Sequence, residues 1–328
     1  MAVQHARAAF FAMAALAATL AWSPGASAQV ANFHPCNAQP ALPICQHGYG
    51  KRVAVQRWGA QPEALDPDAA LRASLVTRNP AREIEKLTST TILVEDMDTA
   101  EVLFARDPDV VRPIASITKL MTALVVLKAG QPLDEMIRID ASDDGVPSEL
   151  PSRLAVGTSL SRSDLLHLAL MSSENSAAHA LGRAYPGGIR AFVDAMNAQA
   201  QALGMTDSRF VEPVGLSNEN VSSASDLARL IKAAARQPLI RQFTTDPGDK
   251  VSGQVFHNTN MLVGRPDWAI LASKTGTTRE AGDCLIMVLE LGGRQLAMVL
   301  LNAQGVSGAR FGDAVRVRRV LSSRMAAK

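Results

Sequence analysis

Apolar runs bounded by glycine and polar residues occur near both ends of the ordered part of the chain. The later runs, rich in Leu, Ile, Val and Met, are predicted to be buried β-strands at residues 268–274, 284–291 and 294–302. Gly292 and Gly293 separate the last two runs, which is typical of a tight hairpin. Residues 91–95 and 101–105, joined by a polar turn, predict another hairpin. Strands are therefore expected at both ends of the folded domain.

Between these strands, the spacing of apolar residues changes to that of amphipathic helices. Cap residues and glycine or proline stops delimit the predicted helices, which cover residues 165–171, 176–185, 189–203 and a segment from the caps at 223–226 to about 238. Residues 310–325 are expected to form a terminal helix. This order predicts an α/β (α+β) fold, in which helices flank one antiparallel sheet and a helical lobe is inserted at about residues 140–245.

The first 28 residues have the pattern of a secretory signal peptide, with a basic start, an apolar run and the cleavage spacing Ala-Ser-Ala at residues 26–28. The apolar run is too short for a comfortable membrane span. We therefore expect cleavage near Ala28, a mature protein outside the cytoplasm, and no integral membrane span. Residues 29–87 lack a sustained hydrophobic period and are expected to form a partly irregular extension before a domain at 88–328.

Export changes the interpretation of the three cysteines, because disulfides persist outside the cytoplasm. Cys36 and Cys45 bracket a short loop that contains prolines, and they are candidates for a local disulfide. Cys284 lies in a predicted strand and is expected to be a buried thiol. No histidine is placed to activate it as a nucleophile.

Composition narrows the classes of partner. With 47% hydrophobic residues in 328, the chain can bury a substantial core. The net charge of +2, without a basic run interleaved with aromatics, gives no reason to expect a nucleic-acid partner. The six histidines lack metal-ligand spacing, and His167 and His179 are expected to be ordinary helix residues. No metal and no cofactor are expected.

A serine and a lysine three residues apart, Ser116 and Lys119, begin an apolar run that ends on Lys128 and Gly130. The run is predicted to be a mostly buried helix with Ser116 in its first turn and Lys119 on the same face. A serine hydroxyl is a weak nucleophile until a neighbouring group takes its proton, and a lysine can do so if burial or a second cation lowers its pKa. The same residues also fit a serine N-cap followed by a solvated lysine, and alone they leave both interpretations open.

Two further motifs lie at positions where the expected fold would form a cleft. Ser173 and Asn175 lie in the break between two predicted helices, and residues 274–277 (Lys-Thr-Gly-Thr) end a predicted strand. Each alone also fits an ordinary turn or strand end. Together with Ser116 and Lys119, they complete the ordered set S-x-x-K, S-x-N and K-T-G, which is named among catalytic motifs.

With this set, the chain resembles the low-molecular-weight serine penicillin-binding proteins, in particular the D-alanyl-D-alanine endopeptidase/carboxypeptidase family. The resemblance covers roughly residues 88–325 and includes PIASITKLM at 113–121, MSSENSAA at 171–178, FVEPVGLS at 210–217, the residues 274–277, and 282–287. It implies the β-lactamase/penicillin-binding-protein transpeptidase-like fold.

The resemblance also implies roles for individual residues. Ser116 is the acylated nucleophile, Lys119 its general base, and Ser173 a relay of the proton towards the leaving amine. The implied substrate-binding residues are Asn175, Lys274, Thr275, Gly276, Thr277 and, more loosely, Arg310. The backbone N–H groups of Ser116 and Thr277 form the implied oxyanion hole. Besides this, two lysines in one cleft cannot both stay charged comfortably, so we expect Lys119 to shift towards the neutral form.

The function that the resemblance implies is that of a periplasmic peptidoglycan endopeptidase. It would hydrolyse D-alanyl–diaminopimelyl crosslinks through a serine acyl-enzyme and would be inhibited by β-lactams. One alternative is a carboxypeptidase that releases terminal D-alanine, with Arg310 as the cation for the terminal carboxylate. Another is a serine β-lactamase that uses Glu212, although the residues after Pro213 do not continue the pattern of those enzymes. A non-enzymatic alternative is a silent cell-wall binding protein.

Overall fold

The computed structural model describes residues 77, 79–144 and 152–327. The predicted signal peptide and the candidate disulfide between Cys36 and Cys45 lie outside the described residues. The same is true of most of the predicted extension.

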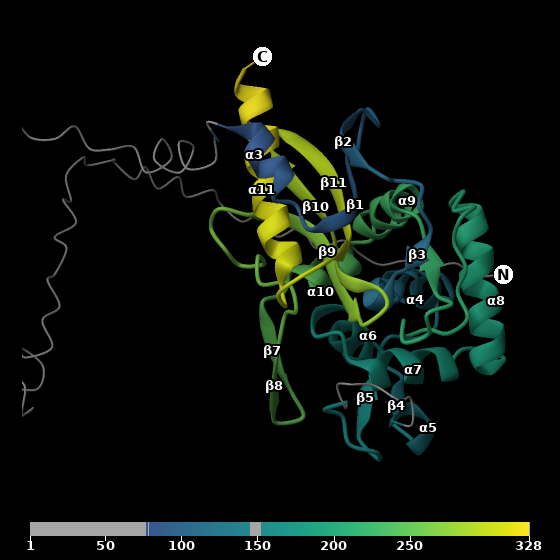
Figure 1. The fold of residues 1–328 in the computed structure, drawn as a ribbon. Coiled ribbons are helices and arrows are strands. Elements are labelled where there is room, and N and C mark those ends of the chain that lie inside the picture. Colours follow the sequence, from purple (N-terminus) through teal and green to yellow (C-terminus); the bar gives the residue numbers. More distant parts are fainter. Residues whose placement is uncertain (1–76, 78, 145–151, 328) are drawn as a thin grey trace, which may run out of the picture. The chain divides into compact units, whose positions relative to one another are not determined.

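A five-stranded antiparallel sheet forms the centre of the domain, with the strand order β2-β1-β11-β10-β9 (Figure 1). Its strands are β1 (Ser89–Asp96), β2 (Val102–Arg106), β9 (Ala269–Thr278), β10 (Gly282–Leu291) and β11 (Arg294–Ala303). The two predicted hairpins are therefore present, and β1 pairs with β11 to join the early and late parts of the chain. The strand β9 lies at one edge of the sheet.

Helices cover both faces of this sheet. On one face, α11 (Ala309–Ala326) packs against β1, β10 and β11, and α3 (Pro80–Glu85) packs beside α11 (Figure 1). On the other face, α9 (Ala224–Ala235) packs against β1, β9, β10 and β11. The helix α3 belongs to the region predicted as an N-terminal extension, and it packs against α11. The predicted fold class is confirmed: an antiparallel sheet is flanked by helices.

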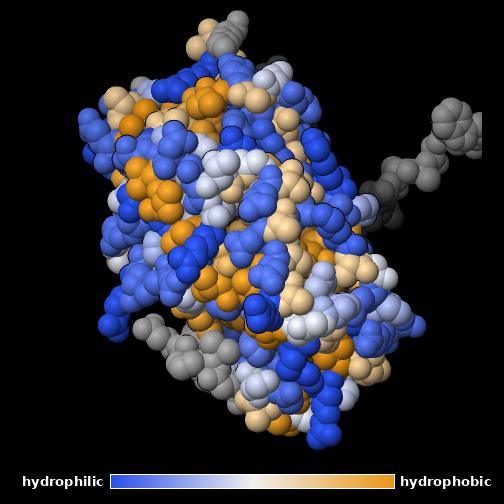
Figure 2. Space-filling view, turned by 90° about the vertical axis from the view of Figure 1, so that its right-hand side faces the viewer, coloured by the Kyte–Doolittle hydropathy of each residue, from blue (hydrophilic) through white to orange (hydrophobic). Residues whose placement is uncertain are grey.

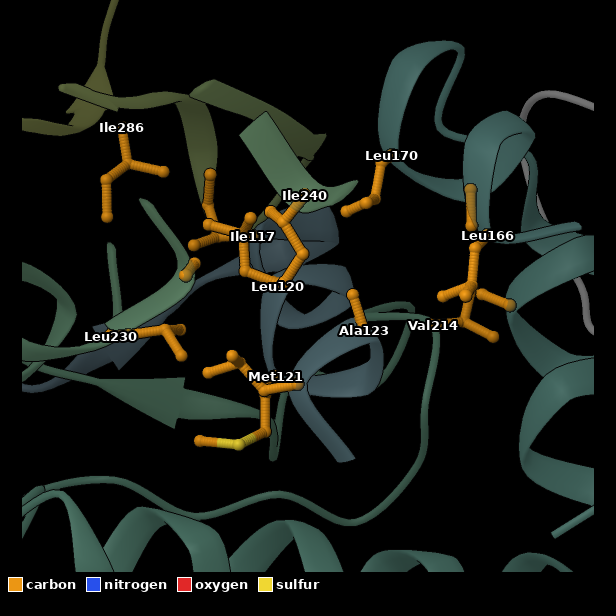
Figure 3. Close-up of a cluster of buried hydrophobic side chains, with 14 of the residues drawn as sticks. Ile117, Leu120, Met121, Ala123, Leu166, Leu170, Val214, Leu230, Ile240 and Ile286 are labelled. Carbon is orange, nitrogen blue, oxygen red and sulfur yellow. The ribbon is translucent and has the colours of Figure 1, made fainter. Parts of the chain in front are cut away.

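The helix after the Ser116 turn, α4 (Thr118–Lys128), forms the centre of the main hydrophobic core. Figure 3 shows Leu120, Met121 and Ala123 among side chains from several other elements. These partners are Leu166 and Leu170 from one lobe helix, Val214 from a loop, Leu230 from α9, Ile240 and Ile286. Leu120 and Met121 are fully buried, and truncating either to alanine is expected to cost about 2–5 kcal/mol. Such packing fixes the start of α4, where Ser116 and Lys119 lie.

The inserted lobe consists of short strands and helices. The elements between α4 and α9 are β4 (Met136–Arg138), α5 (Ala141–Asp144), β5 (Ser159–Ser161), α6 (Arg162–Met171), α7 (Asn175–Arg183), α8 (Gly188–Ala202) and β6 (Val221–Ser222). β6 pairs with β3 (Arg112–Pro113), which precedes α4. The helix α10 (Pro238–Thr245) and the hairpin β7 (Gly248–Val251) and β8 (Gln254–His257) follow α9. Ser161 and Asp164 form the predicted capping box. The hairpin β7–β8 was not predicted from the sequence.

The surface on the side of the domain that carries α8 mixes hydrophilic residues with smaller apolar areas (Figure 2). Within the described parts of the chain, no helix is long and apolar enough to cross a membrane. The arginines of α11 are largely engaged with the protein. Arg318 lies 4.4 Å from the ring of Trp268, and Arg316 pairs with Asp313.

Candidate active site

The sequence predicts Ser116 in the first turn of a helix. In the structure it lies in a 3-10 turn, Ala115–Ile117, directly before α4. Ala115 has a left-handed φ of +47°, a conformation that is strained for a non-glycine residue. Gly215 lies directly behind it, with a φ of +93°, and a Cβ atom there would stand 2.0 Å from the Ala115 carbonyl oxygen. Only glycine fits at position 215, and the turn that carries Ser116 is held in place by this close approach.

The Lys119 side chain is fully buried next to Ser116. Its Nζ donates to Ser116 Oγ at 2.8 Å, to Asn175 Oδ1 at 2.9 Å and to the Val214 carbonyl oxygen at 2.8 Å. These three acceptors match the three donors of an ammonium group. The lysine is therefore fixed in direction, with one of its contacts on the serine hydroxyl.

Burial lowers the pKa of Lys119 to about 7, against the opposing effect of the Glu212 and Glu174 charges. The shift towards the neutral form expected from the sequence is thus present. Of the two causes that the sequence left open, burial and a second cation, burial lowers the pKa of Lys119. Repulsion from other cations acts on Lys274, whose pKa is held well below its usual range by burial and by the nearby charges of Lys119 and Arg310.

Glu212 organises the loop that passes behind Ser116 and Lys119. Its carboxylate accepts from the backbone N–H groups of Val214 and Gly215, each at 2.6 Å, and from those of Leu216 and Ser217. It also accepts from Asn220 Nδ2 at 2.9 Å. The carboxylate is thus engaged in holding the carbonyl of Val214 towards Lys119.

The S-x-N residues lie in the turn between α6 and α7. Ser173 has a left-handed φ of +62°, and Asn175 is the first residue of α7. Between them, Glu174 is 4% exposed and accepts from Ser152 Oγ at 2.8 Å and Arg153 Nε at 2.7 Å. The sequence gave no reason to single out Glu174 or Arg153, because their contacts join segments about twenty residues apart.

The K-T-G residues lie on β9, the edge strand. Lys274 is 1% exposed, and its Nζ donates to the Thr275 carbonyl oxygen at 3.0 Å. A Cβ atom at Gly276 would stand 3.0 Å from the backbone nitrogen of Ser116. The strand therefore passes close beside the nucleophile turn, and glycine permits that approach.

Arg310, at the start of α11, lies against the end of this strand. Its Nη1 donates to Thr277 Oγ1 at 2.5 Å and to Asp283 Oδ1 at 2.8 Å. The side chains of Arg310 and Asp283 are 13% and 10% exposed. Asp283 therefore offsets the charge of Arg310 within the site.

A cavity of about 680 Å³ brings most of the predicted site residues together, since its lining includes Ser116, Ser173, Asn175, Thr275, Gly276, Thr277 and Arg310. Lys119 and Lys274 lie buried next to this lining. The cavity also contains Arg153, Glu174 and Thr259, which the sequence analysis did not identify.

The cysteine and the two histidines considered in the sequence analysis do not line the cavity. Cys284 is buried in β10, as expected, and burial raises the pKa of its thiol to about 11. His179 Nδ1 lies 2.7 Å from Asp143 Oδ1, and His167 stacks on Phe243. Across the described residues, no three His, Cys, Asp or Glu side chains are grouped to hold a metal ion.

Comparison with known proteins places this geometry in context. Residues 77–305 match the family model described as D-alanyl-D-alanine carboxypeptidase. The D-alanyl-D-alanine endopeptidase of Pseudomonas aeruginosa is 48% identical over 245 residues, which cover 73% of this chain and 79% of the relative. The protein of the same name from Escherichia coli is 44% identical, over 77% of this chain and 82% of the relative.

Solved structures agree with the sequence comparisons. The ampicillin-bound penicillin-binding protein D2 of Listeria monocytogenes matches with a TM-score of 0.64 at 32% identity, over 72% of this chain and 97% of that protein. A D-alanyl-D-alanine carboxypeptidase from Mycobacterium tuberculosis matches with a TM-score of 0.65 at 28% identity, over 71% and 90%. The resemblance seen in the sequence is confirmed.

Proposed function

Because this chain belongs to the D-alanyl-D-alanine carboxypeptidase family of serine peptidases, we propose that it is a periplasmic endopeptidase of peptidoglycan. The bond that it hydrolyses is the D-alanyl–diaminopimelyl crosslink, through an acyl-enzyme on Ser116. The observation that carries the chemistry is the contact of 2.8 Å between Nζ of the fully buried Lys119 and Oγ of Ser116.

The reaction follows from this contact. Neutral Lys119 accepts the hydroxyl proton as Ser116 Oγ attacks the D-alanyl carbonyl carbon. The bond to the leaving amine breaks, and the amine receives a proton relayed through Ser173. Water then attacks the ester, which releases the D-alanyl carboxylate and restores the Ser116 hydroxyl.

The backbone N–H groups of Ser116 and Thr277 are proposed to bind the oxyanion that forms in each step. The close approach of Gly276 to the Ser116 nitrogen supports this arrangement. The peptide substrate lies along β9, because an edge strand offers unpaired backbone groups to an added strand. Asn175, which faces the same cavity, binds the substrate backbone from the other side.

Arg310 favours the endopeptidase over the carboxypeptidase. A carboxypeptidase needs a cation that is free to bind the terminal carboxylate, whereas Arg310 is already paired with Asp283 at 2.8 Å. The two relatives above 40% identity carry the name endopeptidase, in agreement with this choice.

Glu212 argues against a β-lactamase. A deacylation base must have an oxygen free to take a proton from water, and the carboxylate of Glu212 is engaged by four backbone N–H groups. A silent binding protein would not need a buried lysine with its pKa near 7 beside the serine. We therefore expect β-lactams to acylate Ser116 and to be released slowly.

Digestion of purified muropeptides tests the proposed function. Chromatography before and after incubation should show crosslinked dimers converted to monomers, with little shortening of monomeric pentapeptide. If pentapeptide shortens quickly while dimers persist, the protein is a carboxypeptidase. Ser116→Ala serves as the inactive control.

Export is proposed from the signal sequence alone. N-terminal sequencing of the secreted protein should begin at Gln29, and non-reducing peptide maps should join Cys36 to Cys45. A retained N-terminus, or free Cys36 and Cys45, would contradict this part of the proposal.

A further inference from the structure

Thr259 lines the active-site cavity and is bonded to two separate parts of the site, although the proposed reaction does not use it. Its Oγ1 accepts a hydrogen bond from Thr275 Oγ1 at 2.6 Å. Its backbone N–H donates to the carbonyl oxygen of Met171 at 3.0 Å. Thr275 belongs to the K-T-G residues of β9, and Met171 ends α6, two residues before Ser173. Thr259 therefore joins the strand β9 to the turn that carries Ser173.

These two parts of the site come from different parts of the fold. The strand β9 belongs to the central sheet, whereas α6 and the turn after it belong to the inserted lobe. The turn is strained at Ser173, whose φ is +62°, so its position depends on the contacts around it. Because Thr259 is bonded to both parts, it helps to set the position of the turn relative to β9.

The segment that carries Thr259 is itself held by hydrogen bonds. Asn258 Nδ2 donates to the carbonyl oxygen of Thr244, near the end of α10, at 3.0 Å. Asn258 Oδ1 accepts from the backbone nitrogen of Asn260 at 2.9 Å. These bonds tie the residues on either side of Thr259 to each other and to α10, which packs against both β9 and α6. The fold thus fixes the position of Thr259, and its hydroxyl can hold a neighbouring side chain in place.

The neighbour that it holds is the side chain of Thr275, which is 4% exposed and lines the cavity. A threonine side chain has more than one staggered rotamer, and each places the hydroxyl at a different point. The bond of 2.6 Å to Thr259 stabilises the rotamer that the structure shows. Loss of the Thr259 hydroxyl would release this rotamer but would keep the backbone bond to Met171. The side chain of Thr259 should therefore act on Thr275 rather than on the Ser173 turn.

We propose that Thr259 is a positioning residue for the substrate, which acts by holding the hydroxyl of Thr275 where the peptide binds. The inference rests on the proposed function, in which the peptide lies along β9, and it needs no choice of the direction in which the peptide runs. Among the hydrogen bonds of the described residues, none joins the Thr259 side chain to Ser116 or Lys119. Its loss should therefore weaken binding and raise KM, while kcat stays nearly unchanged.

Thr259→Val tests the assignment, because valine has nearly the same shape as threonine but lacks the hydroxyl. The steady-state constants are measured on a purified crosslinked muropeptide dimer. We expect KM to rise roughly three- to tenfold, the range for one lost hydrogen bond, with little change in kcat. Thr259→Ser keeps the hydroxyl and should retain the wild-type KM. An unchanged KM in Thr259→Val, or a loss confined to kcat, would overturn the proposal.

A double-mutant cycle with Thr275→Val tests whether Thr259 acts through Thr275. In the Thr275→Val background, Thr259→Val should raise KM no further. Effects of the two substitutions that multiply would show that they act independently, and the proposal would fail.

Thr245→Val is the matched control. Thr245 is half-buried like Thr259, but its hydroxyl donates to the Arg241 carbonyl oxygen within α10, and it does not line the cavity. Its loss should leave KM and kcat unaltered. Reporter-penicillin labelling shows that each variant is folded and acylates. If only peptides ending in D-alanine are cleaved, the same constants are measured on them, and the endopeptidase assignment alone fails.

Discussion

The Nζ atom of Lys119, which is fully buried, lies 2.8 Å from the Oγ atom of Ser116, which faces the cavity. With the lysine charged, all three of its hydrogens point at oxygen acceptors. With the lysine neutral, two hydrogens can remain on Asn175 and Val214 while the lone pair faces the serine hydroxyl. The same geometry therefore serves both protonation states, and the proton can move without rearrangement of the site.

The pH dependence of acylation should report Lys119. Only the neutral amine can accept the serine proton, and burial lowers the pKa of Lys119 to about 7. The second-order rate constant for a reporter penicillin should therefore rise with pH through about 7 and level off above it. A rate that starts to rise only near the usual range for lysine would show that Lys119 is not the base.

Glu174→Gln should move this profile in a stated direction. The Glu174 charge favours the protonated form of Lys119 and raises its pKa, so removal of the charge should move the midpoint to lower pH. Glu219→Gln is the control, because Glu219 is 64% exposed at its side chain and pairs with Arg209, an exposed arginine. Equal profiles for both variants would contradict this account of the electrostatics.

Glu212 should stabilise the loop that carries Val214 and Gly215, and it should not act as a base in deacylation. Glu212→Ala removes the acceptor for four backbone N–H groups and should lower the free energy of unfolding by about 1–3 kcal/mol. Glu212→Gln should leave the slow hydrolysis of the penicilloyl ester nearly unchanged. Denaturant unfolding and release of the label measure the two effects. Rapid steady-state hydrolysis of a chromogenic cephalosporin that Glu212→Gln abolishes would instead support a β-lactamase.

Gly215→Ala should disable acylation, since the new Cβ would stand 2.0 Å from the Ala115 carbonyl oxygen and displace the serine turn. Gly253→Ala is a matched control: its φ of +81° is similar, but no atom lies within 4 Å of the new Cβ. The control should cost about 1 kcal/mol of stability and leave the labelling rate unaltered. Similar labelling by both variants would show that the close approach is unimportant.

Local patterns in the sequence were enough to predict the five strands of the central sheet, most of the longer helices and the three motifs. The capping residues Ser161 and Asp164 and the pair Gly292-Gly293 act over a few positions, so their effects could be read directly. The contacts of Arg153 with Glu174 and Phe256 could not, because they depend on how distant segments pack. The sequence also could not decide whether burial or a second cation lowers the pKa of Lys119, since burial of a side chain depends on the completed core.

Intact-mass measurement of the protein after incubation with a penicillin tests the assignment of the nucleophile most directly. We predict that the mature protein gains the mass of one penicilloyl group, that peptide mapping places it on Ser116, and that it persists for minutes or longer. Ser116→Ala should gain no mass. Specific acylation of the alanine variant, or a label on another residue of the wild-type protein, would contradict the mechanism.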